Sequence, residues 1–133
     1  MEDVGLQGHL GTTFRGAAAR GNYLSADRFD LQLSCKEVCR AVAKPTKHAW
    51  ASLKRICRYL SRAPRLVYES KRQTGKRIDE YTDAGWPGCP RARKSTSGGC
   101  VMLGQHAVEH LFSTQASVSL SSGEAEFAGV IRG

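Results

Sequence analysis

The sequence predicts a mixed protein of the α/β (α+β) class, because its hydrophobic pattern changes period near Pro64. Before that proline, apolar residues recur at helical spacing. After it come short, strand-like segments separated by turn-forming residues. This order predicts two or three helices, then a three-strand antiparallel meander, and then a last helix. With 133 residues and 41% hydrophobic content, the chain is large enough to form a core.

The first half of the chain holds the helical pattern. Residues 1–11 contain several glycines and little periodicity, which predicts an irregular lead-in. The segment 31–45 carries a mostly continuous apolar stripe, and Pro45 is expected to end that helix. The segment 46–62 is predicted to form a second helix, because Thr46 can cap it and Trp50, Leu53 and Ile56 recur every three residues.

The second half has the shorter period of strands. Residues 65–69 are predicted to form a short strand and residues 70–77 a basic loop. Three further strands are predicted at 78–86, 97–104 and 107–115, each followed by turn-forming residues. The last segment predicts a helix that Ser121 or Ser122 caps, with Glu124 in its first turn.

The net charge of +8 is concentrated in one region. Thirteen of the twenty basic residues lie between Lys36 and Arg77, where only Glu37 and Glu69 oppose them. Such an excess favours a polyanionic partner such as nucleic acid, although a solvated helix face explains it equally well. The basic residues of the predicted helix 46–62 are Lys47, Lys54, Arg55, Arg58 and Arg62. Arg91, Arg93 and Lys94 lie in a predicted turn, where they either contact phosphates or are solvated.

No segment approaches the roughly 18 consecutive apolar residues that cross a bilayer, and the N-terminal residues lack the pattern of a signal peptide. We therefore expect an intracellular protein without a membrane partner. The five cysteines form no CxxC pair, so reduced thiols are expected rather than a disulfide framework or a zinc ribbon.

Three acidic residues are candidates for a catalytic site. Asp83 lies within a predicted strand, and Glu124 and Glu126 lie in the first turns of the last predicted helix. A helix that packs across a sheet can bring such acids together, and a divalent ion with oxygen ligands, Mg²⁺ above all, relieves their repulsion. A turn aspartate beside Gly85 and two helix-dipole partners are the simpler interpretation.

Three ordered motifs resemble the ribonuclease H region of copia-type LTR retrotransposon Pol polyproteins. They are "YTDAGW" with Asp83, "RKSTSG" at residues 93–98, and "SSGEAEF" with Glu124 and Glu126. The upstream stretch "KPTKHAWASLKRICRYLSR" resembles the end of the reverse transcriptase in the same family. The resemblance covers roughly residues 30–133.

The resemblance implies three regions: a helical end of reverse transcriptase at 1–64, a strand and basic linker at 65–79, and the N-terminal half of an incomplete ribonuclease H-like fold at 80–133. It also implies a nuclease that cuts the RNA strand of an RNA–DNA hybrid with Mg²⁺, or Mn²⁺, as cofactor. The implied partners are the hybrid or another nucleic acid and the rest of the Pol polyprotein, with no small-molecule substrate. A cytoplasmic particle and the nucleus are both compatible locations.

Asp83 matches the first metal-binding aspartate of the family, which makes it the implied catalytic and metal-binding residue. Glu126 matches the helix glutamate, because Phe127 and Ala128 follow it as an apolar residue and an alanine do in the family, and Glu124 is the alternative. The family adds further carboxylates and a strand after this helix, so we expect the isolated chain to be inactive. A remnant or nucleic-acid-binding module without nuclease activity is the alternative function.

Overall fold

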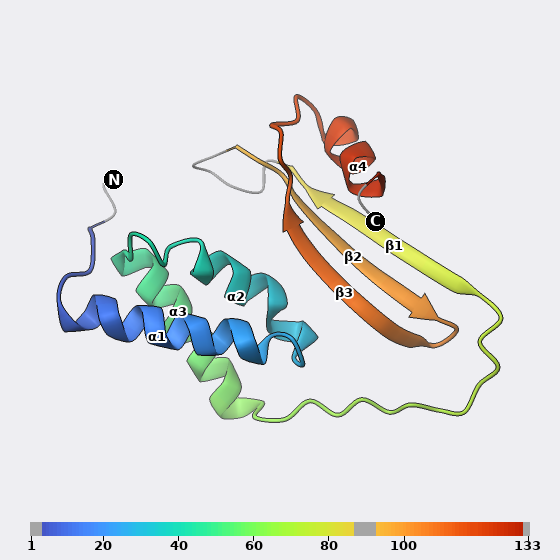
Figure 1. Cartoon of the computed structure of the whole chain (residues 1–133), viewed down its shortest axis with the longest axis horizontal. Coiled ribbons are helices and arrows are strands. Elements are labelled where there is room, and N and C mark those ends of the chain that lie inside the picture. The colour runs from blue at the N-terminus through green and yellow to red at the C-terminus, as the bar shows by residue number, and fades with distance from the viewer. Residues whose placement is uncertain (1–3, 87–92, 132–133) are drawn as a thin grey trace. The chain divides into compact units, whose positions relative to one another are not determined.

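The computed structural model describes residues 4–86 and 93–131, and it divides into two compact units, Met1–Tyr68 and Glu69–Gly133. The first unit is helical. Its elements are α1 (His9–Leu24), the 3₁₀ helix η1 (Phe29–Leu31), α2 (Gln32–Cys39) and α3 (Lys47–Arg62) (Figure 1). The second unit contains β1 (Ile78–Gly85), β2 (Thr96–Leu103), β3 (His106–Thr114) and α4 (Ser122–Val130).

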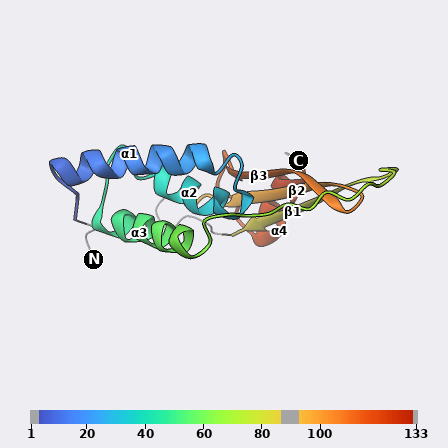
Figure 2. The ribbon, with the colours of Figure 1, turned by 90° about the horizontal axis from the view of Figure 1, so that it is seen from below.

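The core of the helical unit lies where α1, α2 and α3 meet. Phe14 of α1, Cys35 of α2 and Leu53 of α3 are buried together, and the core also includes Ala18, Leu31, Val38, Ala49 and Ile56. The Phe14 ring lies 6.4 Å from the Trp50 ring, which covers the side of the core. Figure 2 shows α2 between α1 and α3 in a view turned by 90°. This burial of large apolar side chains stabilises the helices, which would be marginal in isolation.

Both ends of α3 are held by side-chain hydrogen bonds. Thr46 Oγ1 accepts a hydrogen bond from the Ala49 amide, which satisfies one of the free N–H groups of the first turn. Beyond the other end, the guanidinium of Arg28 donates to the carbonyls of Ala63 and Pro64, at 3.1 and 3.3 Å. The segment that leaves α3 is therefore anchored to the turn between α1 and η1.

The second unit is a three-stranded antiparallel sheet in the order β1-β2-β3, with α4 packed against β1 and β2 (Figure 1). Asp83 pairs with Gly98, which in turn pairs with Phe112. A Cβ on Gly98 would lie 3.0 Å from the Phe112 ring, so the ring lies directly over this glycine. The β1 strand is at one edge of the sheet, and its outer backbone groups face no other described strand.

A buried glutamine joins the sheet to α4. Gln115 is 3% exposed, and its amide nitrogen donates to Ser97 Oγ at 3.0 Å and to the Ala125 carbonyl at 2.7 Å. Its amide oxygen accepts from the Ser119 hydroxyl at 3.0 Å. Three polar contacts thus satisfy an amide that would otherwise be costly to bury. They fix the loop between β3 and α4 as well as the helix itself.

The predicted order of helices, antiparallel meander and last helix is confirmed in the described residues. The lead-in at 1–11 was partly wrong, because α1 begins at His9, where Phe14 and Ala18 supply a buried side that the glycines obscure. The helix predicted for 31–45 was too long. It ends at Cys39, six residues before Pro45. The backbone amides of Ala41 and Val42 then form turn hydrogen bonds to the carbonyls three residues earlier.

The short strand predicted at 65–69 is absent: residues 63–77 form no helix or strand. Val67, at the centre of the predicted strand, is 79% exposed. Its residue type favours a strand, but the segment pairs with no described strand. The later part of this segment is held at the β2–β3 turn, where Gln73 donates to the Leu103 carbonyl at 2.6 Å and accepts from the Gln105 amide at 3.0 Å. Within the described parts of the chain, no helix is long and apolar enough to cross a membrane.

Candidate functional site

Asp83 lies near the end of β1 and is exposed. Successive side chains of a strand project to opposite faces. Ala84, the next residue, is buried toward α4, so Asp83 lies on the other face, on the same side as its pairing partner Gly98. Its carboxylate has no hydrogen bond or ion pair to any residue that the structure describes. It is therefore available to a ligand.

Glu124 has a structural role at the start of α4. Ser121 Oγ accepts a hydrogen bond from the Glu124 amide at 3.2 Å, which confirms the predicted serine cap. The Glu124 carboxylate reaches back and accepts from the Leu120 amide at 2.7 Å. This reciprocal arrangement is close to a capping box. It engages one carboxylate oxygen of Glu124 with the backbone.

Glu126 is half-buried, and its carboxylate has no hydrogen-bond partner within the described residues. It lies one helical turn before Gly129, which contacts the sheet. A Cβ on Gly129 would lie 3.6 Å from Ser97 Oγ and 3.9 Å from Ala84 Cβ. Because Asp83 directly precedes Ala84, its side chain lies on the face of β1 away from this contact, whereas Glu126 lies beside the contact on α4.

Asp83 and Glu126 each offer a carboxylate, the type of ligand that Mg²⁺ binds, but the structure places them on different sides of β1. Mg²⁺ binds proteins through one or two carboxylates and completes its shell with water and substrate phosphates. Among the described residues, neither the Asp83 nor the Glu126 carboxylate has a hydrogen-bond or ion-pair partner. No cluster of three or more His, Cys, Asp and Glu side chains close enough to hold a metal occurs in the described residues.

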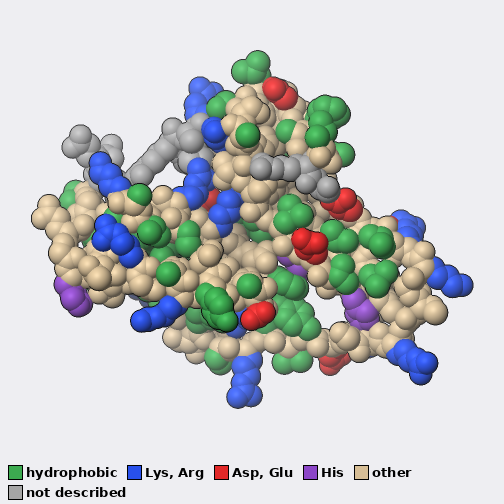
Figure 3. Space-filling view, viewed as in Figure 1, with side chains coloured by type: hydrophobic (Ala, Val, Ile, Leu, Met, Phe, Trp, Pro, Cys, Tyr) green, Lys and Arg blue, Asp and Glu red, His purple; other side chains and the backbone are tan. Residues whose placement is uncertain are grey.

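The basic residues of α3 occupy one side of the helix. At 3.6 residues per turn, they fall within roughly 100° of each other, opposite the buried Ala49, Leu53 and Ile56. The five residues are Lys47, Lys54, Arg55, Arg58 and Arg62, and all are exposed. Figure 3 shows Lys and Arg side chains scattered over the face of the molecule that it draws. None of the five forms an ion pair in the part of the chain that the structure describes.

The structure describes two of the three basic residues of the predicted turn. Arg93 is exposed with φ 52, an unusual backbone conformation for a residue with a side chain, and Lys94 is half-buried. Arg91 lies outside the described residues. Trp86, at the other end of this turn, donates its indole N–H to the Ser119 carbonyl at 2.9 Å. The hydrogen bond ties the end of β1 to the loop that precedes α4.

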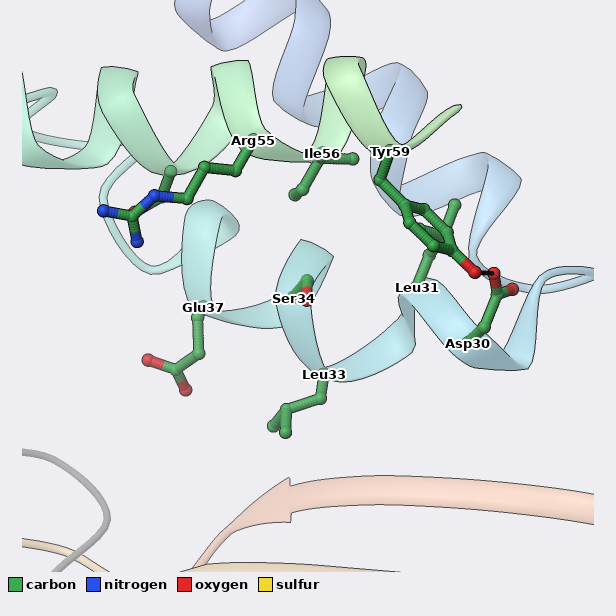
Figure 4. Close-up of a pocket in the computed structure, with 9 residues that line it drawn as sticks. Asp30, Leu31, Leu33, Ser34, Glu37, Arg55, Ile56 and Tyr59 are labelled. Atoms are coloured by element: carbon green, nitrogen blue, oxygen red, sulfur yellow. Dashed lines mark hydrogen bonds between the residues drawn. The ribbon is translucent and has the colours of Figure 1, made fainter. Parts of the chain in front are cut away.

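A groove of about 620 Å³ lies between α2 and α3 (Figure 4). Leu33 and Glu37 line it from α2, and Arg55, Ile56 and Tyr59 line it from α3. Arg55 is therefore the member of the basic group that also lines this groove.

At one end of the groove, the Asp30 carboxylate accepts a 2.7 Å hydrogen bond from the Tyr59 hydroxyl and two from Arg28, at 2.9 and 2.8 Å. The hydrogen bonds from Arg28 above all, and that from Tyr59, lower the pKa of Asp30 to about 2, although burial opposes them. The same carboxylate raises the pKa of Tyr59. Asp30 therefore stays ionised and holds α3 to the turn before α2.

Sequence analysis missed two residues that organise these sites, Arg28 and Gln115. Both are buried polar side chains, at 6% and 3% exposure, that satisfy distant backbone carbonyls. Arg28 was detectable only as a cation close to Asp30 in the sequence. Nothing near Gln115 in the sequence identified Ala125, ten residues later, as its partner.

Comparisons with known proteins found three informative relatives. A retrovirus-related Pol polyprotein from transposon RE2 of Arabidopsis thaliana is 33% identical over 119 residues, which are 90% of this chain and 8% of the polyprotein. An uncharacterized mitochondrial protein of the same plant is 29% identical over 114 residues, 86% of this chain and 48% of that protein. A secreted RxLR effector protein of Plasmopara viticola is 32% identical over 100 residues, 75% of this chain and 70% of that protein.

The chain spans less than half the length of both Arabidopsis relatives. No family model matches the sequence, and no solved structure matches it. The similarity to the polyprotein nevertheless extends over nine-tenths of the chain. The chain therefore belongs to the same family as the Plasmopara viticola protein, and it is homologous to a segment of a retrotransposon Pol polyprotein.

Proposed function

We propose that the chain corresponds to the region of a copia-type Pol polyprotein where the reverse transcriptase ends and the ribonuclease H begins. Three motifs in the order and separation of that family support this, as does the homology to the transposon polyprotein. In this proposal, residues 1–64 are the end of the reverse transcriptase, 65–79 are the linker, and 80–133 are the first half of the ribonuclease H-like domain.

The activity of this region, on the same proposal, is to hold an RNA–DNA hybrid for cleavage of its RNA strand. The observation that carries the binding step is the division of α3 into a buried apolar side and an exposed side of five unpaired cations. Such a helix can neutralise several phosphates along a backbone while its other side stays in the core. Recognition would then follow the shape and 2′-hydroxyls of the hybrid rather than its sequence.

Asp83 and Glu126 are the proposed acidic ligands for the cleavage step. Bound Mg²⁺, or Mn²⁺, would supply an activated water and stabilise the leaving oxygen of the phosphodiester. The carboxylate oxygens of Asp83 would bind the ion from the end of β1. Those of Glu126 would bind it from α4, beside Gly129. Glu124 would keep the helix start in place through its bond to the Leu120 amide. Further carboxylates of the polyprotein are required to complete such a site.

Binding of a labelled RNA–DNA hybrid to the full chain, measured across a range of salt concentrations, tests the first step. A triple variant, Lys47→Gln, Lys54→Gln and Arg58→Gln, should weaken binding by about tenfold or more and flatten the salt dependence by about one unit of slope for each lost phosphate contact.

The matched control removes three charges from the linker instead, by Lys71→Gln, Arg72→Gln and Lys76→Gln. An equal loss of affinity for the hybrid in both triple variants would show that binding depends on net charge and not on α3. Binding that does not change with salt would refute the proposed nucleic-acid interface.

A cleavage assay separates the nuclease from its alternative, a remnant that only binds nucleic acid. We expect no cleavage of the hybrid by this chain in Mg²⁺ or Mn²⁺, and cleavage by a longer Pol segment that retains this region. Asp83→Asn in the longer segment should abolish cleavage while it leaves hybrid binding intact. A longer segment that remains inactive would favour the remnant, and robust cleavage by the short chain would contradict the need for further carboxylates.

A further inference from the structure

Three side chains with sulfur or nitrogen donor atoms meet on one face of the sheet, the same face on which Asp83 lies. Cys100 and Met102 lie on β2, and His110 lies on β3, directly opposite Cys100 in the strand register. Cys100 Sγ is 3.7 Å from Met102 Sδ and 3.9 Å from His110 Nε2. All three residues are half-buried. The proposed nuclease function uses none of them.

The spacing of these atoms suits a shared metal ion. With metal–sulfur bonds of about 2.3 Å and metal–nitrogen bonds of about 2.0 Å, neighbouring donors on one ion stand roughly 3.5–4 Å apart at trigonal or tetrahedral angles. Both measured separations fall in that range. An ion bound to Cys100 Sγ could therefore reach Met102 Sδ or His110 Nε2 with little movement of the strands that carry them.

The donor types select the ion. A thioether such as Met102 is a poor ligand for Mg²⁺ and Ca²⁺, which require oxygen, whereas thiolate and thioether sulfur together favour Cu⁺. A β-bulge between Val101 and Met102 changes the strand register next to the cluster. Such bulges commonly change the direction in which a side chain projects. Met102 thus contributes to the cluster from an irregular position of β2.

The other described cysteines lack such surroundings. Cys35 and Cys39 belong to the helical unit, where burial raises the pKa of both thiols and keeps them protonated. Cys57 is exposed on α3. Cys100 is the thiol in the described parts of the chain with both a thioether sulfur and an imidazole nitrogen recorded within 4.0 Å.

We propose that Cys100, Met102 and His110 form a binding site for a soft monovalent ion, Cu⁺. Binding replaces the thiol proton of Cys100 with a copper–sulfur bond and releases that proton to solvent. The copper and the sulfur keep their oxidation states, so no oxidant or reductant takes part. Met102 Sδ and His110 Nε2 each donate a lone pair to the same ion.

The test is an anaerobic Cu⁺ titration of the full chain against a chromophoric Cu⁺ chelator. Met102→Leu keeps the volume of the side chain and removes only its sulfur, and it should raise the Kd for Cu⁺ by about tenfold or more. Cys100→Ser should remove the site. Cys57→Ser is the matched control, since it deletes an exposed thiol of α3, and it should bind Cu⁺ as the wild type does.

A second measurement uses the wild-type chain and does not depend on the folding of any variant. One equivalent of Cu⁺ should protect Cys100 from iodoacetamide, and leave Cys57 reactive, when the alkylated peptides are identified by mass spectrometry. Equal protection of both thiols would refute the site. So would a folded Met102→Leu variant with the affinity of the wild type, because the ion would then bind to exposed thiols alone.

Discussion

Replacement of Asp30 by asparagine tests whether its charge anchors α3. Asp30→Asn keeps the size of the side chain but removes the charge that Arg28 and Tyr59 stabilise. The pKa of Asp30 falls from 3.8 to about 2 in the folded chain. At about 1.4 kcal/mol per pKa unit, this corresponds to roughly 2 kcal/mol. The Asp30 side chain is 21% exposed, so solvent screening reduces the expected loss to about 1 kcal/mol.

The pH dependence of this loss follows from the direction of the pKa shift. Because the folded pKa lies below the unfolded one, the ionised carboxylate contributes its full stability above about pH 4. That contribution disappears as the pH falls through about 2, where the carboxylate is protonated in both states. The variant should therefore be less stable than the parent at neutral pH and equal to it at the acid limit.

Urea unfolding, followed by the fluorescence of Trp50, measures this difference in the helical unit. Trp86→Phe in both proteins removes the signal of the second unit, since the chain has two tryptophans. Asp27→Asn is the matched control, because Asp27 is an exposed acid close to Asp30 with no ion pair among the described residues. A stability loss that is the same at pH 3 and pH 7 would refute the charge-based explanation, and so would an equal loss in the control.

Three further predictions concern the second unit. Gln115→Ala should lower the free energy of unfolding of the second unit by about 2–4 kcal/mol, because three buried hydrogen bonds are lost. Hydrogen exchange measures this loss, and unchanged exchange would show that water replaces the lost bonds. Gly129→Ala should be tolerated, or should stabilise α4 by up to about 1 kcal/mol in thermal unfolding, since the added Cβ makes only ordinary van der Waals contacts. Gly129→Leu, with a much larger side chain, should displace the helix from the sheet. Mn²⁺ should broaden NMR signals around Asp83, with a weaker effect in Glu126→Gln and an unchanged effect in Glu124→Gln. The opposite order would assign the metal to Glu124.

The sequence predicted most of the elements of the fold, because their signals are local. The period of apolar residues located α3 and the three strands, and the serine before Glu124 located the start of α4. The short strand at 65–69 was wrong because β propensity does not create a pairing partner. The whole of α1 was missed, because glycines dilute an apolar side that becomes evident only once Phe14 is seen in the core.

The candidate site could be predicted only as far as its residue types. The motifs named Asp83, Glu124 and Glu126, but helical periodicity left the two glutamates equivalent. Their hydrogen-bond partners distinguish them, and these depend on the conformation of the loop before α4, where the Leu120 amide turns toward Glu124. The Cys100 cluster also needed the strand register, because residues 100 and 110 are brought together only by the β2–β3 pairing.

The segment between α3 and β1 makes this chain separable. It has no helix or strand from residue 63 to residue 77, and each of its ends is held by the unit beside it: Arg28 holds the carbonyls after α3, and Gln73 holds the turn of the sheet. Lys71, whose amide donates to His106, and Arg72 are exposed in this segment, where trypsin can cut after a basic residue. A single nick there would leave the helical fragment with its hydrophobic core, while the sheet fragment would keep its strand pairing and the hydrogen bonds of Gln115.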